Sequence, residues 1–261
     1  MPPAPPLHTV AHGLPFASLM IVTFLGTKGG TGTTTLAVNC AEDIRRLTGR
    51  STLLVDGKAG PGDVAVFLGL RPRYSIVDFI DQLGWTSRTL AARFLTEHNC
   101  GVHVLSASDG FGRPSARDAE GVEQTLRCLS SMYEFIVIDA GSTMTACAAV
   151  ALTMSDAVML VANPDMPCLR NLQRYGDALR LTGVAPERVR IVLNRTSENG
   201  VLPVGEIEKV LNRTIDHQLP SDYRTVAAAL STGVPVSCLR STELHLQITA
   251  MARSLVGRAA A

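Results

Sequence analysis

The chain has 261 residues, of which 46% are hydrophobic and 18% are charged, so it holds enough apolar material for one large α/β domain or two small ones. Its formal net charge of +1 argues against a protein that binds nucleic acid through an overall basic surface, although a local basic patch stays open. The six cysteines are dispersed, without a C-x-x-C pair or a Cys/His cluster, which argues against a zinc site or a disulfide scaffold and favours a reducing cytoplasm.

The N-terminal segment is rich in proline and carries no targeting signal. It begins MPPAPPLHTVAHGLP, without the basic start and long apolar stretch of a signal peptide. No part of the chain reaches the ~18 consecutive apolar residues of a membrane span. The prolines predict a flexible lead-in over residues 1–17, followed by one domain over residues 18–258.

Apolar runs alternate with helical stretches from residue 18 onward, a pattern typical of repeated βα units. Residues 19–25 predict the first strand, and residues 34–47 predict the helix that follows a glycine-rich loop. Further strands are predicted at residues 52–56, 102–105, 135–139, 157–161, 189–194 and 215–217. Continuous apolar strands are expected where helices cover both faces of a sheet. The fold class is therefore α/β, with three layers and a mostly parallel, twisted sheet in the middle.

The loop at residues 26–35 reads GTKGGTGTTT and joins the first strand to the first helix. A glycine loop in this position offers backbone N–H groups and the positive end of a helix to phosphate oxygens. Gly29, Gly30 and Gly32 allow a ligand to approach the backbone closely. The hydroxyl of Thr34 stands where P-loops bind Mg²⁺. The loop is therefore a candidate phosphate site of a nucleotide.

Two residues depart from the ordinary P-loop pattern G-x-x-x-x-G-K-[ST]. Thr27 replaces the first glycine and Thr33 replaces the lysine. On these positions alone, a glycine-rich turn without a ligand is the alternative interpretation. Lys28 favours the nucleotide site, because the run K-G-G-x-G-x-[ST]-[ST] resembles the deviant Walker A motif of the MinD/ParA family.

The resemblance to the MinD/ParA family, whose members share the three-layer P-loop NTPase fold, implies a role for the loop and for two aspartates. It implies that Lys28 reaches across a nucleotide-bridged homodimer to the phosphates of the partner subunit. ATP or ADP with Mg²⁺ is the implied cofactor, with phosphates held by Gly29, Gly30, Thr31, Gly32, Thr33, Thr34 and Thr35. Asp56 and Asp139 match the Walker A′ and Walker B carboxylates, held with Thr34 near Mg²⁺ and the attacking water. An aspartate at a strand end is otherwise more often a turn or cap residue.

Asn194 and Pro220 are the candidate contacts of the nucleotide base. Asn194, in the run VLNR, matches an asparagine that contacts adenine in the family, and its amide offers both a donor and an acceptor to a base edge. The run that contains Pro220 would then flank the base. A turn-capping role for Asn194 stays open as the alternative.

Three further segments resemble the CpaE/TadZ branch of that family, whose members act in Flp/Tad pilus assembly. They are residues 62–75, 163–171 and 219–226, and the run GTTT in the loop is common in that branch. The resemblance implies a cytoplasmic protein that dimerises through its nucleotide face, works with pilus or secretion assembly proteins, and is recruited to a cell pole or an inner-membrane assembly. Many members also carry an N-terminal receiver-like domain, and we expect none here because fewer than twenty residues precede the first predicted strand.

Lys58 is a further departure from the family pattern. Relatives expected to be active carry D-x-D after the second strand, whereas this chain reads Asp56-Gly57-Lys58. A protonated lysine cannot accept a proton from water and repels Mg²⁺, and Thr33 removes a positive charge from the phosphates. We therefore expect ATP hydrolysis to be slow or lost. One hypothesis is that Lys58 restores the charge lost at Thr33, and the alternative is that Lys58 is a solvated loop residue.

The C-terminal stretch at residues 243–255 carries apolar residues at positions 244, 248, 251 and 255, the stripe of an amphipathic helix. MinD proteins end in such a helix that binds membrane, but few basic residues and no bulky aromatic residue accompany this stripe. We therefore expect the helix to dock on the domain, and any membrane contact to be peripheral or through partners.

Two other functions stay open. One is an active MinD/ParA-type ATPase that places the cell-division site, and the other is a ParA-like protein that partitions DNA. The near-neutral charge counts against DNA binding, which needs salt-sensitive contacts to phosphates.

Overall fold

The computed structural model describes residues 19–58, 60–82, 88–109, 116–197, 200 and 202–259. Within these residues, eight strands form one sheet in the order β3-β4-β2-β5-β1-β6-β7-β8. The pairing of β3 with β4 is antiparallel and the other pairings are parallel. The strands are β1 Met20–Gly26, β2 Thr52–Asp56, β3 Thr96–Glu97, β4 His103–Leu105, β5 Phe135–Asp139, β6 Ala157–Ala162, β7 Val189–Thr196 and β8 His217–Pro220.

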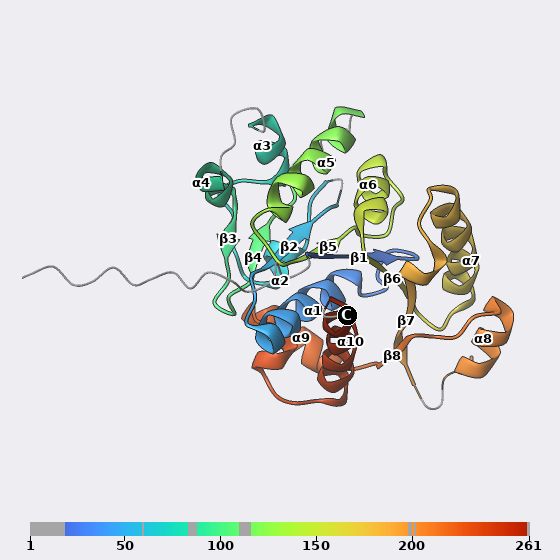
Figure 1. Ribbon diagram of the computed structural model, residues 1–261. Coiled ribbons are helices and arrows are strands. Elements are labelled where there is room, and N and C mark those ends of the chain that lie inside the picture. The colour runs from blue at the N-terminus through green and yellow to red at the C-terminus, as the bar shows by residue number, and fades with distance from the viewer. Residues whose placement is uncertain are drawn as a thin grey trace, which may run out of the picture.

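Helices cover both faces of this sheet (Figure 1). On one face lie α1 Thr33–Thr48, α2 Val64–Phe67, α9 Tyr223–Thr232 and α10 Glu243–Ala259. The other face carries α3 Ile76–Asp81, α5 Ala116–Ser130, α6 Ala146–Met154 and α7 Met166–Leu181, with α8 Val204–Leu211 beside α7. The connections also contain α4 Arg88–Ala91 and the 3₁₀ turns Ala92–Phe94, Pro186–Arg188 and Val236–Cys238.

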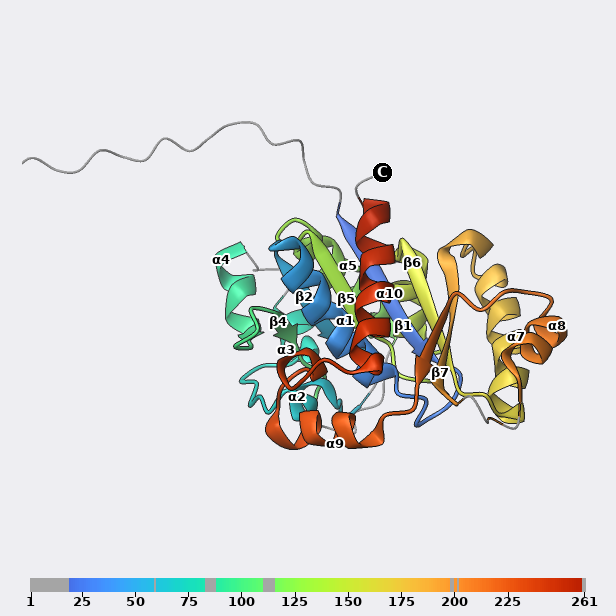
Figure 2. The ribbon, with the colours of Figure 1, turned by 90° about the horizontal axis from the view of Figure 1, so that it is seen from below.

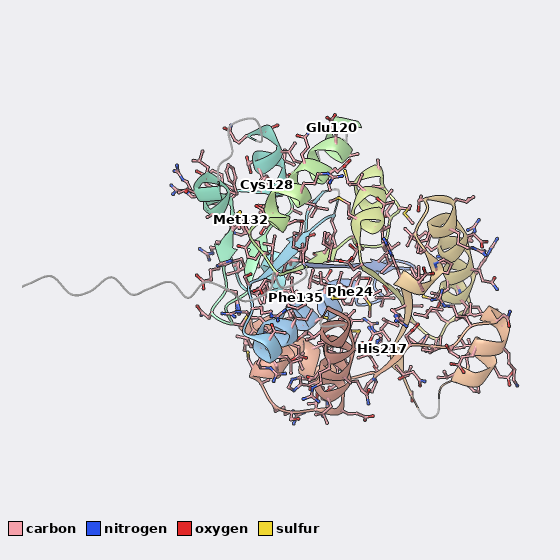
Figure 3. The ribbon with its side chains drawn as sticks, in the orientation of Figure 1. Phe24, Glu120, Cys128, Met132, Phe135 and His217 are labelled. Carbon is pink, nitrogen blue, oxygen red and sulfur yellow. The ribbon has the colours of Figure 1, made fainter. Side chains whose placement is uncertain are left out.

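The core lies on both faces of the sheet because successive side chains of a strand point to opposite faces. On β1, Val22 and Phe24 are buried with the helices of the α1 face, whereas Ile21 and Leu25 are buried on the opposite face. Phe24 and Phe135 come from the paired strands β1 and β5 and lie in the middle of the molecule (Figure 3). The continuous apolar composition of β1 therefore reflects burial on both sides.

The helix ends follow local sequence signals. Gly49 ends α1 with a left-handed φ of 67°, a conformation that favours glycine. Ser75 and Asp78 form a capping box at the start of α3, in which each side chain accepts a hydrogen bond from the other residue's backbone N–H. Asp165 caps α7 by accepting a hydrogen bond of 2.9 Å from the N–H of Cys168.

The predicted α/β class with a mostly parallel sheet is confirmed; most predicted strand bounds agree with the structure within two residues, and two strands differ more. The edge strand β3 was not predicted, because two residues carry no periodic pattern. The last strand runs over His217–Pro220 rather than over residues 215–217. Asp216 lies just before this strand, and its carboxylate accepts a hydrogen bond of 2.8 Å from the N–H of Ile191 in β7. The predicted lead-in at residues 1–17 lies outside the described residues, and the boundaries 18–258 stay a prediction.

The C-terminal helix α10 packs along α1, as Figure 2 shows. Leu244, Ile248, Met251 and Leu255 are at most 3% exposed and belong to the core on that face. The predicted docking of the apolar stripe is therefore confirmed. Of the helices in the described residues, none has the length and apolar composition that crossing a membrane requires.

Candidate functional site

The glycine loop lies at the carboxyl ends of the central strands. The N–H of Gly26 donates to the carbonyl of Gly141 at 2.8 Å, and the N–H of Thr27 donates to the carbonyl of Val161 at 2.8 Å. Gly30 and Gly32 have φ angles of 81° and 91°, in the left-handed region where a Cβ is strained. The α-helix α1, 16 residues long, begins directly after Gly32. The loop amides therefore surround the positive end of a long helix, which is the arrangement that binds phosphate.

Thr33, at the position of the P-loop lysine, makes a side-chain hydrogen bond within the loop. Its Oγ1 lies 3.1 Å from Oγ1 of Thr31, which in turn donates to the carbonyl of Lys28 at 3.1 Å. A Cβ added to Gly26 would come within 2.4 Å of the Thr33 Oγ1, so this strand end is also restricted to glycine. Thr33 therefore stabilises the loop and brings no cation to it.

A polar cluster joins the start of α1 to the ends of β2 and β5. Thr34 Oγ1 donates a hydrogen bond of 2.6 Å to Asp139 Oδ2. The ammonium of Lys58 lies 3.0 Å from Thr34 Oγ1 and 3.7 Å from Asp139 Oδ2, and it is also paired with Asp63. The structure thus brings together the predicted metal ligands Thr34 and Asp139, but in contact with a side-chain cation.

Burial and charge oppose each other in this cluster. Burial raises the pKa of Asp139, and the charge of Lys58 and the hydrogen bond from Thr34 offset part of that rise. Burial lowers the pKa of Lys58, but the charge of Asp139 and the hydrogen bond to Asp63 outweigh it and raise that pKa. The lysine therefore stays protonated at neutral pH and offsets part of the negative charge of the carboxylates.

Asp56 lies beside Asp139 in the register of β2 and β5, with its carboxylate turned to the start of α2. Its Oδ2 accepts a hydrogen bond of 3.1 Å from the N–H of Val64. A Cβ on Gly62 would lie only 2.0 Å from the same oxygen, so the chain needs glycine there. Burial, followed by the charge of Asp139, raises the pKa of Asp56 to about 6.

Lys28 is held by α7 at the mouth of the loop. Its Nζ donates a hydrogen bond of 2.9 Å to Asp165 Oδ2, and both side chains are more than one third exposed. This hydrogen bond raises the pKa of Lys28. Burial opposes the ionisation of Asp165, but the hydrogen bonds from the Cys168 N–H and from Lys28 prevail and lower its pKa. Asn171 of α7 also donates to the carbonyl of Thr27 at 2.7 Å, so α7 fixes the loop at two points.

The loop opens into a cleft of about 720 Å³. Three cations line this cleft within the described residues: Lys28, Lys58 and Arg195. A smaller pocket of about 220 Å³ adjoins it and is lined by Asn194 and Pro220 among others. Arg195 lines both cavities, and its left-handed φ of 59° arises where the pairing of β7 with β8 is irregular. The larger cleft beside the loop and the smaller pocket beside Asn194 therefore share one wall at Arg195.

Asn194 is bound to the glycine loop. Its Nδ2 donates a hydrogen bond of 2.7 Å to the carbonyl of Thr31, and the residue is 7% exposed. A Cβ on Gly32 would lie 2.4 Å from this nitrogen. One of the two N–H donors of the Asn194 amide is therefore committed to the loop, and the role of Asn194 toward a base stays a prediction.

The structure brings the predicted residues to one edge of the sheet, and it adds three that were not assigned a role: Asp63, Asp165 and Arg195. Asp63 and Asp165 each precede a helix, which is a signal that the sequence does contain. Arg195 follows Asn194 in sequence, but the position of Arg195 in both cavities depends on an irregular pairing of β7 with β8, which no sequence pattern predicted.

Comparisons with known proteins identify a matching family model and a curated relative that covers most of the chain. The family model described as cellulose biosynthesis protein BcsQ matches residues 19–182. Septum site-determining protein MinD of Thermotoga maritima is 22% identical over 237 residues, which cover 88% of this chain and 85% of that protein.

Two solved structures show the same fold. The ParA family ATPase of Chlorobium tepidum superposes with a TM-score of 0.83 at 21% identity, over 91% of this chain and 98% of that chain. MinD of Pyrococcus horikoshii, solved in complex with Mg-ADP, superposes with a TM-score of 0.75 at 22% identity, over 92% of this chain and 98% of that chain.

Proposed function

Because the chain belongs to the cellulose biosynthesis protein BcsQ family, a group of MinD/ParA-type P-loop ATPases, we propose that it is an ATP-binding switch of a cell-envelope machine. The observation that carries this proposal is the glycine loop, whose residues line a cleft of about 720 Å³ at the start of α1. Helix N-termini with glycine loops bind phosphate through backbone N–H groups.

We assign the phosphates of ATP or ADP to Gly29, Gly30 and residues 31–35 of the loop. The base then lies in the adjoining pocket of about 220 Å³ beside Pro220. Asn194 forms part of that wall, and one Nδ2 N–H donates to Thr31, which leaves Oδ1 as an acceptor and the second N–H as a donor for the edge of a base.

The residues around Thr34 do not fit Mg²⁺ as they are arranged. Mg²⁺ requires oxygen ligands in a near-octahedral shell, whereas the Lys58 ammonium contacts both Thr34 and Asp139. We therefore derive no step from a metal ion.

Slow or absent hydrolysis follows from the same site. Phosphoryl transfer depends on charge neutralisation and on a positioned water. Thr33 brings no charge to the phosphates because its side chain is a neutral hydroxyl, which lies in hydrogen-bond contact with Thr31. The position of the second carboxylate is occupied by Lys58, and the Asp56 carboxylate is engaged by the Val64 N–H. ATP then acts chiefly by changing the association state of the protein.

The association that we propose is a homodimer through the nucleotide face. Lys28 stands at the mouth of the cleft with its side chain 39% exposed, where it can exchange Asp165 for a phosphate of the partner subunit. Val66 and Leu230 line the same cleft and are 66% and 46% exposed, which provides apolar surface for a second copy. The MinD/ParA resemblance supports this mode of dimerisation.

The machine that we propose is one of cellulose synthesis in the cell envelope, since that is the description of the matching family model. Flp/Tad pilus assembly, with recruitment from the cytoplasm to a pole or an inner-membrane complex, is the second candidate. It rests on the segments at residues 62–75, 163–171 and 219–226, which resemble the CpaE/TadZ branch. A deletion strain separates the two: loss of cellulase-sensitive dye binding supports the first, and loss of surface pili supports the second.

Sedimentation without nucleotide, with ADP and with ATP tests the switch, followed by a phosphate-release assay on the same samples. We expect a dimer only with ATP, and little phosphate release. Lys28→Ala should remove the ATP-dependent dimer, whereas Lys209→Ala should keep it, because Lys209 is exposed on α8 and pairs with Glu206. A protein that binds no ATP and stays monomeric would refute the proposal. Rapid turnover that Asp56→Ala abolishes would favour an active MinD-type ATPase, and ATP-dependent, salt-sensitive DNA binding would favour a ParA-type function.

A further inference from the structure

The Lys58 side chain occupies a built position in the cleft. Its Nζ donates to Thr34 Oγ1 at 3.0 Å, lies 3.7 Å from Asp139 Oδ2 and pairs with Asp63. Its stem lies against Gly141, where an added Cβ would be 3.1 Å from Lys58 Cγ. Only 20% of the Lys58 side chain is exposed, so the residue is not a solvated loop lysine.

The contacts of Lys58 are those that a divalent cation would make. The threonine hydroxyl and the aspartate carboxylate are oxygen donors, and Mg²⁺ would need them at about 2.0–2.1 Å in a near-octahedral shell. An ammonium 3.0 Å from Thr34 Oγ1 fills that volume. A second cation in the same volume would be repelled by the Lys58 ammonium, which already has its charge paired with Asp63 and lies 3.7 Å from Asp139 Oδ2.

An ammonium is also suited to hold a phosphate in this place. Lysine carries three N–H donors around a compact charge. Thr34 and Asp63 take two of these donors, which leaves one for a phosphate oxygen in the cleft that Lys58 lines. The side chain that departs from the family pattern therefore supplies positive charge where the pattern expects metal and carboxylate.

We propose that Lys58 takes the place of the divalent cation in this site, so that the chain binds ATP and ADP without a metal ion. This inference rests on the proposed function, since it requires that the cleft bind a nucleotide. If Lys58 replaces the metal ion, the affinity of the chain for ATP and ADP does not depend on Mg²⁺.

Calorimetric titration with ATP, in EDTA and in excess Mg²⁺, tests the proposal on the full chain. For the wild type we expect the dissociation constants in the two buffers to agree within about twofold. Lys58→Asp restores a carboxylate beside Asp139, so Mg²⁺ should tighten its ATP binding by about tenfold or more. Lys209→Asp is the matched control, because Lys209 is the one lysine besides Lys28 and Lys58 in the sequence and lies exposed on α8. It should behave as the wild type does.

A second variant and a second readout keep the test independent of the folding of Lys58→Asp. Lys58→Met keeps an apolar stem against Gly141 and removes the charge, so its ATP affinity in EDTA should fall about tenfold. Mn²⁺ alone, followed by electron paramagnetic resonance, should remain free with the wild type and bind to Lys58→Asp.

Two results would overturn the proposal in different ways. A wild-type affinity for ATP that falls about tenfold in EDTA would refute the replacement of the metal and leave the proposed function intact. The absence of ATP binding in both buffers would refute the proposed function and this inference together.

Discussion

Replacing Asp56 by asparagine should stabilise the protein at neutral pH. Asp56 is 1% exposed, and burial together with the charge of Asp139 raises its pKa from 3.8 to about 6. Each pKa unit corresponds to 1.36 kcal/mol between protonation states, so ionised Asp56 costs about 3 kcal/mol of folding stability above pH 6. Asp56→Asn removes this cost, and its carbonyl oxygen can still accept the hydrogen bond from the Val64 N–H.

The sign of this effect defines its pH window. The folded state holds the Asp56 proton more tightly than the unfolded chain, so the wild-type free energy of unfolding falls as pH rises from 3.8 to about 6. Asp56→Asn should therefore gain up to about 3 kcal/mol over the wild type at pH 8, and the gain should shrink toward zero near pH 4.

Urea unfolding at several pH values measures the difference, provided that the slope with denaturant stays unchanged. Asp165→Asn is the control of opposite sign, because its interactions with Cys168 and Lys28 lower the pKa of Asp165. That variant should lose stability at neutral pH, with the loss vanishing as pH falls through the lowered pKa. If Asp56→Asn gains nothing at pH 8, or gains as much at pH 4, the burial argument is refuted.

Gly32→Ala should lose about 1–2 kcal/mol in denaturant unfolding, because Gly32 has a φ of 91° and its Cβ would lie 2.4 Å from Asn194 Nδ2. Gly176 lies in α7, where an added Cβ would have no neighbour within 4 Å, so Gly176→Ala should instead stabilise the protein by about 1 kcal/mol. If the two alanine variants change stability equally, the loop geometry at Gly32 is contradicted. Asn194→Ala leaves the Thr31 carbonyl without its donor, so thermal unfolding should show a loss of about 1–3 kcal/mol and calorimetry should show weaker ATP binding. If stability and ATP affinity are both unchanged, the contact does not hold the loop. In α10, Ile248 is 0% exposed, so Ile248→Ala should lower the free energy of unfolding by about 2–5 kcal/mol. Leu246 is 59% exposed, so Leu246→Ala should change it by no more than about 0.5 kcal/mol. Equal losses in the two variants would contradict the docking of α10.

The sequence determined the order of the elements and the position of the loop. Continuous apolar runs predicted β1, β2, β5, β6 and β7, because strands buried on both faces need apolar residues at every position. The aspartates that close two of these runs, Asp56 and Asp139, were predicted at strand ends, and the register of β2 and β5 pairs these two residues. The apolar stripe of α10 was likewise a local pattern with period 3.6.

Tertiary structure alone decided which polar side chains meet. Lys58 reaches Thr34 across 24 positions and Lys28 reaches Asp165 across 137 positions of sequence. Such contacts depend on the strand order of the sheet and on side-chain direction, which no local pattern encodes. From the sequence, Lys58 was either a compensating charge or a solvated lysine, and only its packing against Gly141 and Thr34 favours the first. The burial of each strand and helix follows from the local pattern of apolar residues, whereas the electrostatics of the site arise from residues that only folding brings together.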